Sequence, residues 1–439
     1  MTYAEAVARL LALRGGEHAG MRPGLERIEG LLAALGHPEE RYTLVQVGGT
    51  NGKGSIAATL ATILKHAGRR VGLYTSPHLR SFRERIRVNG AAIAPDAVVD
   101  GVDALGTSIA RLDATMFEAT TALALDHFAR ESVDVAVLEV GLGGRLDSTT
   151  VGRPAATVLG RIDFDHEAYL GRTLPEIAAE KAAIIRSGRA FSAAQAPEVT
   201  EVIVRRAEAV GVPLLLEGRD LAVTVTARTL EGQRVSCAGP GWRLDDVELP
   251  LLGVFQPANA LLAVATARAL GADEAAIRRG VTRVRWPGRF DVVRRDPFLV
   301  LDGAHNPAGA RVLAASLRQA FGDRPVTFVL GLSRDKDAGA ILGALAPLAH
   351  RMILTRASNP RAADPRSLFA ALPPTTAVVE TAESPAEALR MATRAPQPPI
   401  ICVAGSLFLI GDVLTLLAPE PDKPCSIEKG VDSIGPLFP

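Results

Sequence analysis

Short β-rich runs and longer helical patterns alternate along most of the chain. Apolar runs predict strands at 42–47, 70–74, 133–140 and 155–159. Between these runs, apolar residues recur with helical spacing, for example at 56–67 and 117–130. Alternation of this kind is typical of βαβ units, so the first part of the chain is predicted to contain a parallel sheet.

The pattern changes further along the chain. Residues 221–253 are typical of antiparallel hairpins appended to the first domain, and 257–271 return to a helical pattern. A second α/β series follows, in which each β-rich run ends in a turn: FLVLDGAHNP, PVTFVLGL, HRMILT, TAVVET and PIICVAG.

The length and one shift in composition indicate where the domains divide. A chain of 439 residues is too long for one ordinary core. The composition turns to Arg, Pro and Gly at 283–298, and from 419 onward no periodicity remains. We therefore expect an N-terminal domain at 1–285, a linker at 286–297, a C-terminal domain at 298–418 and a flexible tail at 419–439.

Composition excludes some classes of protein. Apolar residues make up 48% and aromatic residues only 4%, which suits Ala, Val, Leu and Ile helices stacked on a parallel sheet. The 49 basic and 48 acidic residues leave a net charge of +1, so the excess charge typical of nucleic-acid binding is missing. No nucleic-acid partner is therefore expected.

The cysteines and the apolar segments indicate a cytoplasmic protein. Cys237, Cys402 and Cys425 have no metal-binding spacing, and an odd number of scattered thiols argues against a disulfide framework. Residues 1–16 read as an amphipathic helix rather than a secretion signal. The run at 407–418 contains Asp412 and is too short to span a bilayer, so no membrane association is expected.

The segment VQVGGTNGKGSIAATL at 45–60 carries the clearest chemistry. A strand, a glycine-rich turn and a helix form the geometry in which backbone N–H groups and a helix dipole bind phosphate. Lys53 is placed to reach the β- and γ-phosphates of a nucleotide. Compared with the pattern G-x-x-x-x-G-K-S/T, GGTNGKGS has Gly54 inserted between Lys53 and Ser55. The segment predicts a nucleoside-triphosphate site.

Many ordered segments resemble the folylpolyglutamate synthase/dihydrofolate synthase family of the Mur ligase superfamily. They lie between residues 22 and 415: GLERIEGLLAALG, GTNGKGS, TSPHL, MFEATTALAL, LEVGLGGRLDST, EKAAII, QPANA, WPGRF, LDGAHNP, RDKD, SNPRA and AGSLFLIGDV. The resemblance implies an α/β fold with a P-loop-containing parallel-sheet N-terminal domain and a smaller Rossmann-like α/β C-terminal domain.

A magnesium site is expected beside the P-loop. Glu139 ends a strand of almost wholly apolar residues, and an acid there emerges next to the P-loop of a parallel sheet. The resemblance implies that Ser76, Glu139 and His166 bind Mg²⁺, although magnesium prefers oxygen to nitrogen ligands. It also implies that Lys181 is carbamylated and holds a second Mg²⁺, which requires a lysine with a lowered pKa.

The resemblance assigns further residues. Those implied in ATP binding are Thr50, Asn51, Gly52, Lys53, Gly54, Ser55, Asn259, Arg289 and Asp302. His305 is expected to assist catalysis with Lys53 and Lys181, and closure of the two domains would exclude water. Those implied in folate binding are Thr75, Thr115, Leu146, Asp147 and Ser148.

The implied activity is that of an ATP-dependent acid–amino-acid ligase. ATP would phosphorylate a carboxylate of a reduced folate or of dihydropteroate, and the amine of L-glutamate would displace phosphate from the acyl phosphate. The chain carries no Ser-His or Cys-His signature of a nucleophilic enzyme, which agrees with this chemistry. The expected protein is a monomer that binds small-molecule substrates.

Two alternatives remain. A muramyl-peptide ligase shares the P-loop and the chemistry but places a further domain ahead of the P-loop, whereas 47 residues precede Gly48 here. A nucleotide-binding sensor without catalysis would usually have lost a metal ligand or the phosphate-binding lysine, and both are present. ATP hydrolysis that depends on pterin and glutamate would eliminate a sensor.

Three departures from the family's pattern also stand out. Arg22-Pro23 occupies a place where an acidic residue is common in members that make dihydrofolate, Thr150 replaces a frequent Asn, and Phe255 replaces a frequent His. The first change concerns the pteroate side, so the sequence leaves open whether one or both ligase reactions occur.

Overall fold

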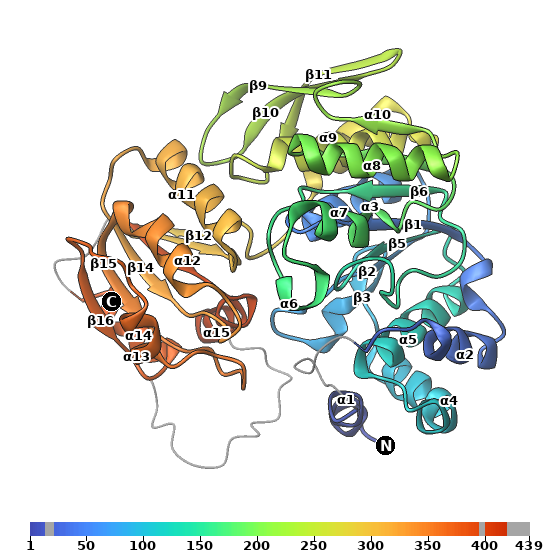
Figure 1. The fold of residues 1–439 in the computed structure, drawn as a ribbon, viewed down its shortest axis with the longest axis horizontal. Helices are drawn as coiled ribbons and strands as arrows, with labels where there is room; N and C mark the ends of the chain where they lie inside the picture. The colour runs from blue at the N-terminus through green and yellow to red at the C-terminus, as the bar shows by residue number, and fades with distance from the viewer. Residues whose placement is uncertain (14–21, 395–399, 419–439) are drawn as a thin grey trace. The chain divides into compact units, whose positions relative to one another are not determined.

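The chain forms two compact units, Met1–Trp286 and Pro287–Pro439, each with its own sheet (Figure 1). The structure, a computed structural model, describes residues 1–13, 22–394 and 400–418. The tail expected at 419–439, with Cys425, lies outside the described residues.

A sheet with the strand order β4-β3-β2-β5-β1-β6-β7-β8 forms the centre of the first unit. Its parallel strands are β1 (Thr43–Gly48), β2 (Val71–Tyr74), β5 (Val135–Glu139), β6 (Ala156–Leu159), β7 (Arg189–Ser192) and β8 (Leu214–Leu216). Antiparallel strands β3 (Ile86–Val88) and β4 (Ala91–Ala92) extend one edge. The predicted parallel sheet is confirmed, since β1, β2, β5 and β6 lie in the segments expected to be strands.

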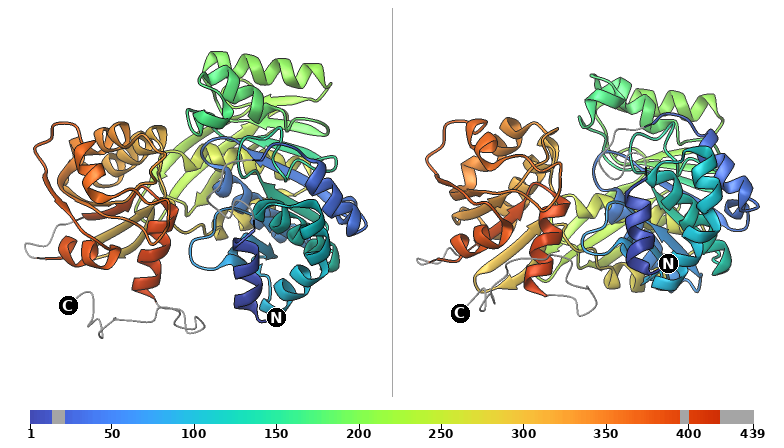
Figure 2. Two further views of the ribbon diagram at one scale, coloured as in Figure 1. Left: turned by 60° about the horizontal axis from the view of Figure 1, so that its bottom comes forward. Right: turned by 90° about the horizontal axis from the view of Figure 1, so that it is seen from below.

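Helices cover both faces of this sheet (Figures 1 and 2). The longer ones are α1 (Tyr3–Leu11), α2 (Glu26–Ala34), α3 (Lys53–His66), α4 (Pro95–Leu112), α5 (Met116–Arg130), α7 (Leu174–Ala182), α8 (Pro197–Ala209), α9 (Gln256–Ala269) and α10 (Glu274–Arg283). Shorter pieces are α6 (Glu167–Leu170) and the 3₁₀ turns η1 (Pro38–Glu40) and η2 (Phe82–Arg85). Helices α1, α5 and α7 begin with a Thr-x-x-Glu capping box, which satisfies N–H groups at their N-termini.

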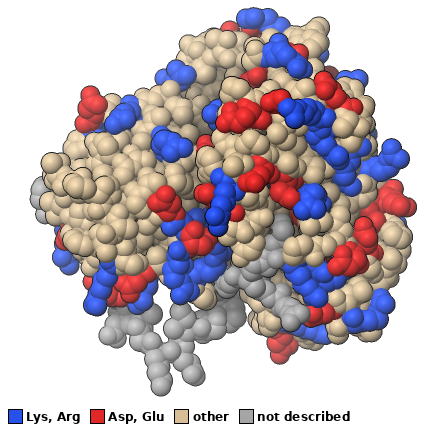
Figure 3. All heavy atoms as spheres, viewed as in Figure 1, with Lys and Arg blue, Asp and Glu red and all other residues tan. Residues whose placement is uncertain are grey.

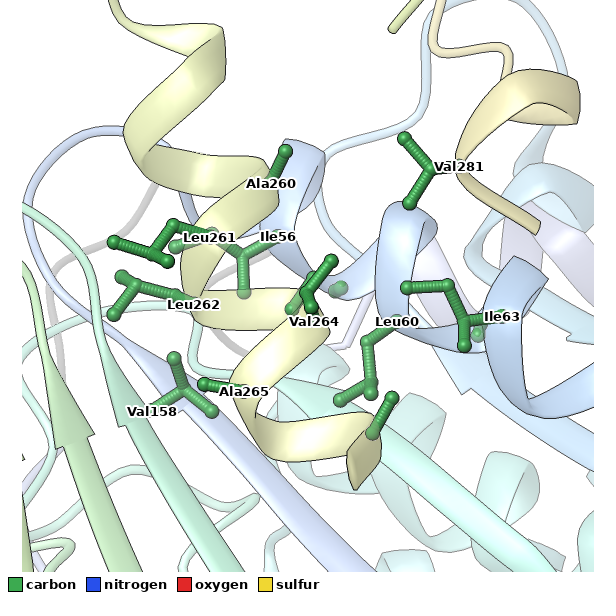
Figure 4. Close-up of a cluster of buried hydrophobic side chains, with 14 of the residues drawn as sticks. Ile56, Leu60, Ile63, Val158, Ala260, Leu261, Leu262, Val264, Ala265 and Val281 are labelled. Carbon is green, nitrogen blue, oxygen red and sulfur yellow. The ribbon is translucent and has the colours of Figure 1, made fainter. Parts of the chain in front are cut away.

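The alternation of side chains along β1 separates the two faces. Val45 and Val47 are buried against α3 and α9, whereas Leu44 faces the cluster that contains residues of α2, α4 and α5. Figure 4 shows residues of α3 such as Ile56 and Leu60 packed against α9 and α10. Because both faces are covered, the strands are apolar along most of their length.

The hairpins predicted at 221–253 are confirmed. Strands β9 (Ala222–Arg228), β10 (Gln233–Gly239) and β11 (Trp242–Leu249) form an antiparallel sheet in the order β11-β10-β9. Its buried residues, among them Val235 and Leu244, belong to the same core cluster as α9.

The second unit is a separate α/β layer structure with the strand order β12-β13-β17-β14-β15-β16. The strands are β12 (Asp291–Arg295), β13 (Phe298–Asp302), β14 (Val326–Leu330), β15 (Ala349–Leu354), β16 (Val378–Thr381) and β17 (Ile400–Ala404). The helices are α11 (Pro307–Phe321), α12 (Ala338–Leu345), α13 (Pro365–Ala370), α14 (Pro385–Ala392) and α15 (Leu407–Leu417), with a 3₁₀ turn η3 (Ala346–Leu348). All neighbours are parallel except β12 and β13.

Part of the segment expected to be a linker is ordered within this second sheet. Strand β12 pairs antiparallel with β13, and its register shifts between Val292 and Arg294. The charged residues of DVVRRDPF obscured the strand in the sequence because an edge strand can expose polar side chains.

The surface carries both signs of charge. On the face drawn in Figure 3, Lys and Arg are interspersed with Asp and Glu, in keeping with the net charge of +1. Among the described residues, no helix has the length and apolar character needed to cross a membrane. In α15, the most apolar late segment, Asp412 accepts hydrogen bonds from the backbone and side chain of Ser358.

Candidate active site

The candidate residues of the first unit gather at one edge of its sheet. Strands β2, β5, β1 and β6 are consecutive neighbours and run parallel, so their carboxyl ends meet at this edge. Ser76 follows β2, Glu139 ends β5, the P-loop follows β1, and His166 lies in the segment after β6. The topology thus explains why residues distant in sequence share one site.

The glycines of the P-loop are required by its geometry. Gly49 and Gly52 have positive φ of 124° and 89°. A Cβ at Gly49 would lie 3.0 Å from the backbone of Gly160, and one at Gly52 would lie 2.5 Å from Oδ1 of Asn259. Helix α3 then begins at Lys53, so the N–H groups of its first turn point out of the helix end, as in anion-binding sites.

The start of the P-loop is fastened to the segment after β6. The backbone N–H groups of Thr50 and Asn51 both donate to the carbonyl of Arg161, at 2.9 and 3.1 Å. The hydroxyl of Thr50 donates to the carbonyl of Asp163 and accepts from its N–H. These two predicted ATP-binding residues therefore use those groups within the protein, and the first turn of α3 is the better source of phosphate donors.

Helix α9 supports the P-loop from the other side. Gln256 is fully buried and donates from Nε2 to Oγ of Ser55 at 3.2 Å. Its Oε1 accepts from Nδ2 of Asn259, which in turn abuts Gly52. Asn259 is thereby brought to the P-loop, as expected.

Two lysines share one acceptor in the P-loop. Nζ of Lys53 donates to the carbonyls of Gly49 and Thr50, at 3.2 and 3.0 Å. Nζ of Lys181, a residue only 4% exposed, donates to the same Gly49 carbonyl at 3.3 Å. Burial, and then the charge of Lys53, lower the pKa of Lys181 to about 7. The structure therefore brings the predicted catalytic lysines together, and one of them is poised to be neutral.

The predicted metal ligands Ser76 and Glu139 are also adjacent. The N–H of Ser76 donates to Oε2 of Glu139 at 3.2 Å, and Glu139 is only 5% exposed. Arg85 is buried close by and donates from Nε to Nδ1 of His78. It also interacts electrostatically with the Glu139 carboxylate. Burial lowers the pKa of Arg85 to about 10, and the Glu139 carboxylate opposes that shift. A buried cation therefore lies within electrostatic range of the Glu139 carboxylate.

His166 lies at the N-terminus of α6 with a left-handed backbone, φ 53°. Its Nε2 is 3.8 Å from Oδ1 of Asp165, and the charge of Asp165 also acts on Lys181. The hydroxyl of Ser76 and the carboxylate of Glu139 fit the oxygen preference of Mg²⁺, and His166 would add a less common nitrogen.

The loop after β5 is held together by Asp147. Its carboxylate accepts from the N–H groups of Gly141, Leu142 and Thr149 and from the hydroxyl of Thr149. Burial raises the pKa of Asp147, and these hydrogen bonds oppose that shift. Asp147, a predicted folate contact, therefore uses its carboxylate to shape the loop that carries Leu146 and Ser148.

Thr150, one of the departures from the family's pattern, completes this loop. It donates to the carbonyl of Gly144 and accepts from Nε2 of the buried Gln46. A Cβ at Gly144 would lie 2.7 and 3.0 Å from the carbonyls of Glu180 and Lys181. The loop is thus packed directly onto the end of α7, beside Lys181.

A buried ion pair joins two segments expected near the folate. Arg27 donates from Nε to the carboxylate of Glu118 at 2.9 Å, and both side chains are buried. Nη2 of Arg27 donates to the carbonyl of Arg22 at 2.8 Å, and Glu118 accepts from the N–H of Thr115. Thr115, the N-cap of α5, is thereby tied to this ion pair.

Two further contacts lie in the same group of predicted folate-binding segments. Thr75 donates from its N–H to the carbonyl of Arg85. The side chain of Arg22 forms an ion pair with Asp113 at 2.8 Å.

In the second unit, Asp302 organises a cluster at the end of β13. Its carboxylate accepts from the N–H groups of Phe290 and Ala304, at 2.7 and 2.8 Å. Burial raises the pKa of Asp302, and Arg289 opposes that shift. His305 lies 2.8 Å from the carbonyl of Gly303 through Nδ1, which must be the donor.

Comparison with known proteins assigns the family. Residues 47–267 match the Mur ligase middle domain, and residues 288–407 match the Mur ligase, glutamate ligase domain. A dihydrofolate synthase/folylpolyglutamate synthase of Bacillus subtilis is 34% identical over 90% of this chain and 95% of its own length. The chain belongs to the folylpolyglutamate synthase/dihydrofolate synthase family. The predicted family and fold class are thereby confirmed.

Further matches agree with this family. A crystal structure of Mycobacterium tuberculosis folylpolyglutamate synthase, complexed with ADP and AMPPCP, matches with a TM-score of 0.87 and 34% identity, over 96% of this chain and 100% of that one. A probable bifunctional folylpolyglutamate synthase/dihydropteroate synthase of Halobacterium salinarum is 39% identical over 94% of this chain. The chain spans about half of that relative, 52% of its length.

The sequence did not single out three residues that act on the predicted site of this folylpolyglutamate synthase/dihydrofolate synthase family member. Gln256 donates to Ser55, Arg85 interacts with the charge of Glu139, and Asp165 acts on Lys181. The available signals were the position of Gln256 at the start of a helical pattern and that of Asp165 next to His166. Trp286 was quoted in WPGRF, but nothing in the sequence showed that it contacts the P-loop.

Proposed function

We propose that this protein is an ATP-dependent ligase that joins L-glutamate to a carboxylate of a folate acceptor. One observation carries the proposal most directly: Lys53 of the P-loop and the buried Lys181 donate to the same Gly49 carbonyl. A buried lysine on α7 with a pKa of about 7, in contact with a phosphate-binding loop, has little structural value, but it suits a carbamate. The names of the relatives support the acceptor and the amino acid.

The nucleotide would be bound by the P-loop. The first turn of α3 would supply N–H donors to the phosphates, and Lys53 would offset the charge that develops on the transferred phosphoryl group. The roles predicted for Asn259, Arg289, Asp302 and His305 remain predictions, of which Asn259 is supported by its contact with Gly52.

Ser76, Glu139 and His166 would hold Mg²⁺, which when bound neutralises phosphate charge. The neutral amine of Lys181 can attack CO₂: a new N–C bond forms, the nitrogen releases a proton, and a carbamate anion results. Burial favours this step because a pKa of about 7 leaves a large share of the amine unprotonated at neutral pH, whereas an exposed lysine is almost wholly protonated there. The carbamate would provide the oxygen ligands for a second Mg²⁺.

The reaction then follows from charge neutralisation and positioning. An acceptor carboxylate oxygen attacks the γ-phosphorus of ATP, which gives an acyl phosphate and ADP. The glutamate amine adds to the acyl carbon, the tetrahedral intermediate loses phosphate, and the nitrogen loses a proton as the amide forms. In these ligase steps the two nucleophiles come from the substrates, so no protein side chain needs to act as one.

The identity of the acceptor depends on the segments that carry the predicted folate contacts. Thr75, Thr115 and the loop around Asp147 remain the proposed contacts, and the Arg27–Glu118 pair would hold their segments in place. Arg22, where an acidic residue is common in dihydrofolate-forming members, pairs with Asp113 and so adds no uncompensated charge. We therefore propose that polyglutamylation is retained and that dihydropteroate is the second acceptor to test.

The proposal is tested by phosphate release from ATP and Mg²⁺ with and without L-glutamate. Dihydropteroate and a reduced monoglutamyl folate are offered in separate reactions, with Lys53→Ala as the inactive control. Glutamate-dependent release with both acceptors identifies a bifunctional ligase, and release with folate alone identifies a dedicated polyglutamate synthase. Release with neither acceptor contradicts the proposal.

A further inference from the structure

Gly54 is the residue by which this P-loop departs from the common pattern, and it lies under an indole ring. A Cβ at Gly54 would lie 2.8 Å from Nε1 of Trp286 and 3.1 Å from its Cε2 and Cζ2. Gly54 is in the first turn of α3 and is not among the glycines with positive φ. Its missing side chain therefore serves the close approach of the ring rather than an unusual backbone conformation.

Trp286 also packs against the core. It is half-buried and packs against the core cluster that α3 and α9 share. Val284, two residues earlier, is fully buried in the same cluster. The indole thus contacts both the core and the residue that follows Lys53, so a shift of the first turn of α3 would bear on the ring.

Trp286 is the last residue of the first unit. The backbone continues through Pro287 into Gly288, whose carbonyl accepts from the N–H of Gly303 at 2.9 Å. Arg289 comes next, and Phe290 donates from its N–H to Asp302 at 2.7 Å. The covalent chain therefore runs in three residues from the indole on the P-loop to a predicted nucleotide-binding arginine.

We propose that Trp286 is a positioning residue that links nucleotide occupancy of the P-loop to the segment 287–289. Phosphate bound at the first turn of α3 alters the position or rigidity of Gly54, and the ring seated on Gly54 follows because no side chain lies between them. The inference rests on the proposed function, because the ligand that it invokes is the nucleotide. It also accounts for the glycine inserted after Lys53.

A double-mutant cycle tests the contact. Gly54→Ala should lower kcat/KM for ATP by roughly tenfold, because its methyl group displaces the ring. Trp286→Ala should cause a similar loss, and Trp286→Phe should restore most of it. In the double variant Gly54→Ala/Trp286→Ala, the loss should not exceed that of the worse single variant. Gly343→Ala in α12 is the matched control, because its Cβ would meet only Pro373, at 3.4 Å.

Fluorescence separates positioning from a purely structural role. The chain has two tryptophans, and Trp242 lies on β11 with the Arg268 guanidinium 5.2 Å from its ring. In Trp242→Phe, where Trp286 is the remaining indole, AMPPCP should change the emission. In Trp286→Phe, which keeps Trp242, AMPPCP should leave the emission unchanged. Nucleotide binding is measured independently by equilibrium dialysis, and melting curves confirm that each variant folds.

The outcomes are distinguishable. Bound nucleotide with an emission change from Trp286 and non-additive kinetic losses supports the inference. Bound nucleotide with unchanged Trp286 emission, or with losses that multiply in the double variant, overturns the inference and leaves the proposed function intact. Absence of nucleotide binding overturns the proposed function and the inference together.

Discussion

Replacement of Lys181 by Met tests the burial of its amine through stability. Methionine is one atom shorter than lysine, so it keeps most of the packing of the side chain but cannot carry a charge. Burial lowers the pKa of the wild-type amine to about 7 in the folded protein, from the 10.5 of an exposed lysine. This lowering of the pKa, by about 3.5, corresponds to a penalty of roughly 5 kcal/mol for the buried charge, since a pKa change of one is worth about 1.4 kcal/mol.

The sign of the pH dependence follows from linkage. Below pH 7 the lysine is charged in both the folded and the unfolded states, so the whole penalty for the buried charge is present. Between about pH 7 and 10.5 the unfolded state binds more protons, and wild-type stability rises with pH by up to about 1.4 kcal/mol per unit. Lys181→Met should therefore be more stable by several kcal/mol at pH 6.5, and this advantage should shrink toward pH 10.

The assay is urea unfolding followed by circular dichroism, in CO₂-free buffers from pH 6.5 to 10 and without nucleotide. The transition of the first unit is compared between wild type and variant, with Lys65→Met as the control. Lys65 is exposed on α3 and donates to the carbonyl of Asn89, so its replacement should give a small difference that changes little with pH. A Lys181→Met difference that stays constant between pH 7 and 10 would refute the assigned burial.

Further predictions concern activity and one buried ion pair. Lys53→Ala should lower glutamate-dependent phosphate release by at least about a thousandfold, with an unchanged melting temperature; near-normal release would exclude its phosphate role. Wild-type activity should fall in CO₂-free buffer and return with bicarbonate. Lys181→Ala should stay inactive with bicarbonate but regain part of its activity with a short carboxylate. Full activity of Lys181→Ala without additives would exclude the carbamate. In urea unfolding, Arg27→Met should lower the free energy of unfolding by about 3–5 kcal/mol, because the Glu118 carboxylate stays buried without its cation. The double variant Arg27→Met/Glu118→Leu should recover much of this loss. Equal losses in both variants would contradict the stabilising role of the pair.

The sequence predicted the residues whose position follows from strand order. Lys53 and Glu139 each follow an apolar run, and the carboxyl ends of parallel strands meet at one edge. The alternation of strands and helices was sufficient to predict the parallel sheet, because a sheet covered by helices on both faces has apolar strands that stand out in the sequence. The edge strand Asp291–Arg295 escaped prediction because its two valines stand among charged residues in a segment rich in Arg, Pro and Gly.

Tertiary contacts between distant segments could not be predicted in the same way. Lys181 in EKAAII has the pattern of an exposed helical lysine, and its burial depends on the P-loop, 132 residues away in sequence. The hydrogen bond from Gln256 to Ser55 spans 201 residues, and the contact of Trp286 with Gly54 joins residues that are still farther apart in the sequence. Local patterns carry no information on such pairings.

The most direct test of the account is the fate of oxygen in the acceptor carboxylate. A reduced monoglutamyl folate labelled with ¹⁸O in its carboxylates is incubated with the protein, ATP, Mg²⁺ and L-glutamate, and the released phosphate is analysed by mass spectrometry. The account predicts that each phosphate released with amide formation carries one ¹⁸O, because an acyl phosphate forms and loses that oxygen. Amide formation with unlabelled phosphate would contradict the acyl-phosphate route.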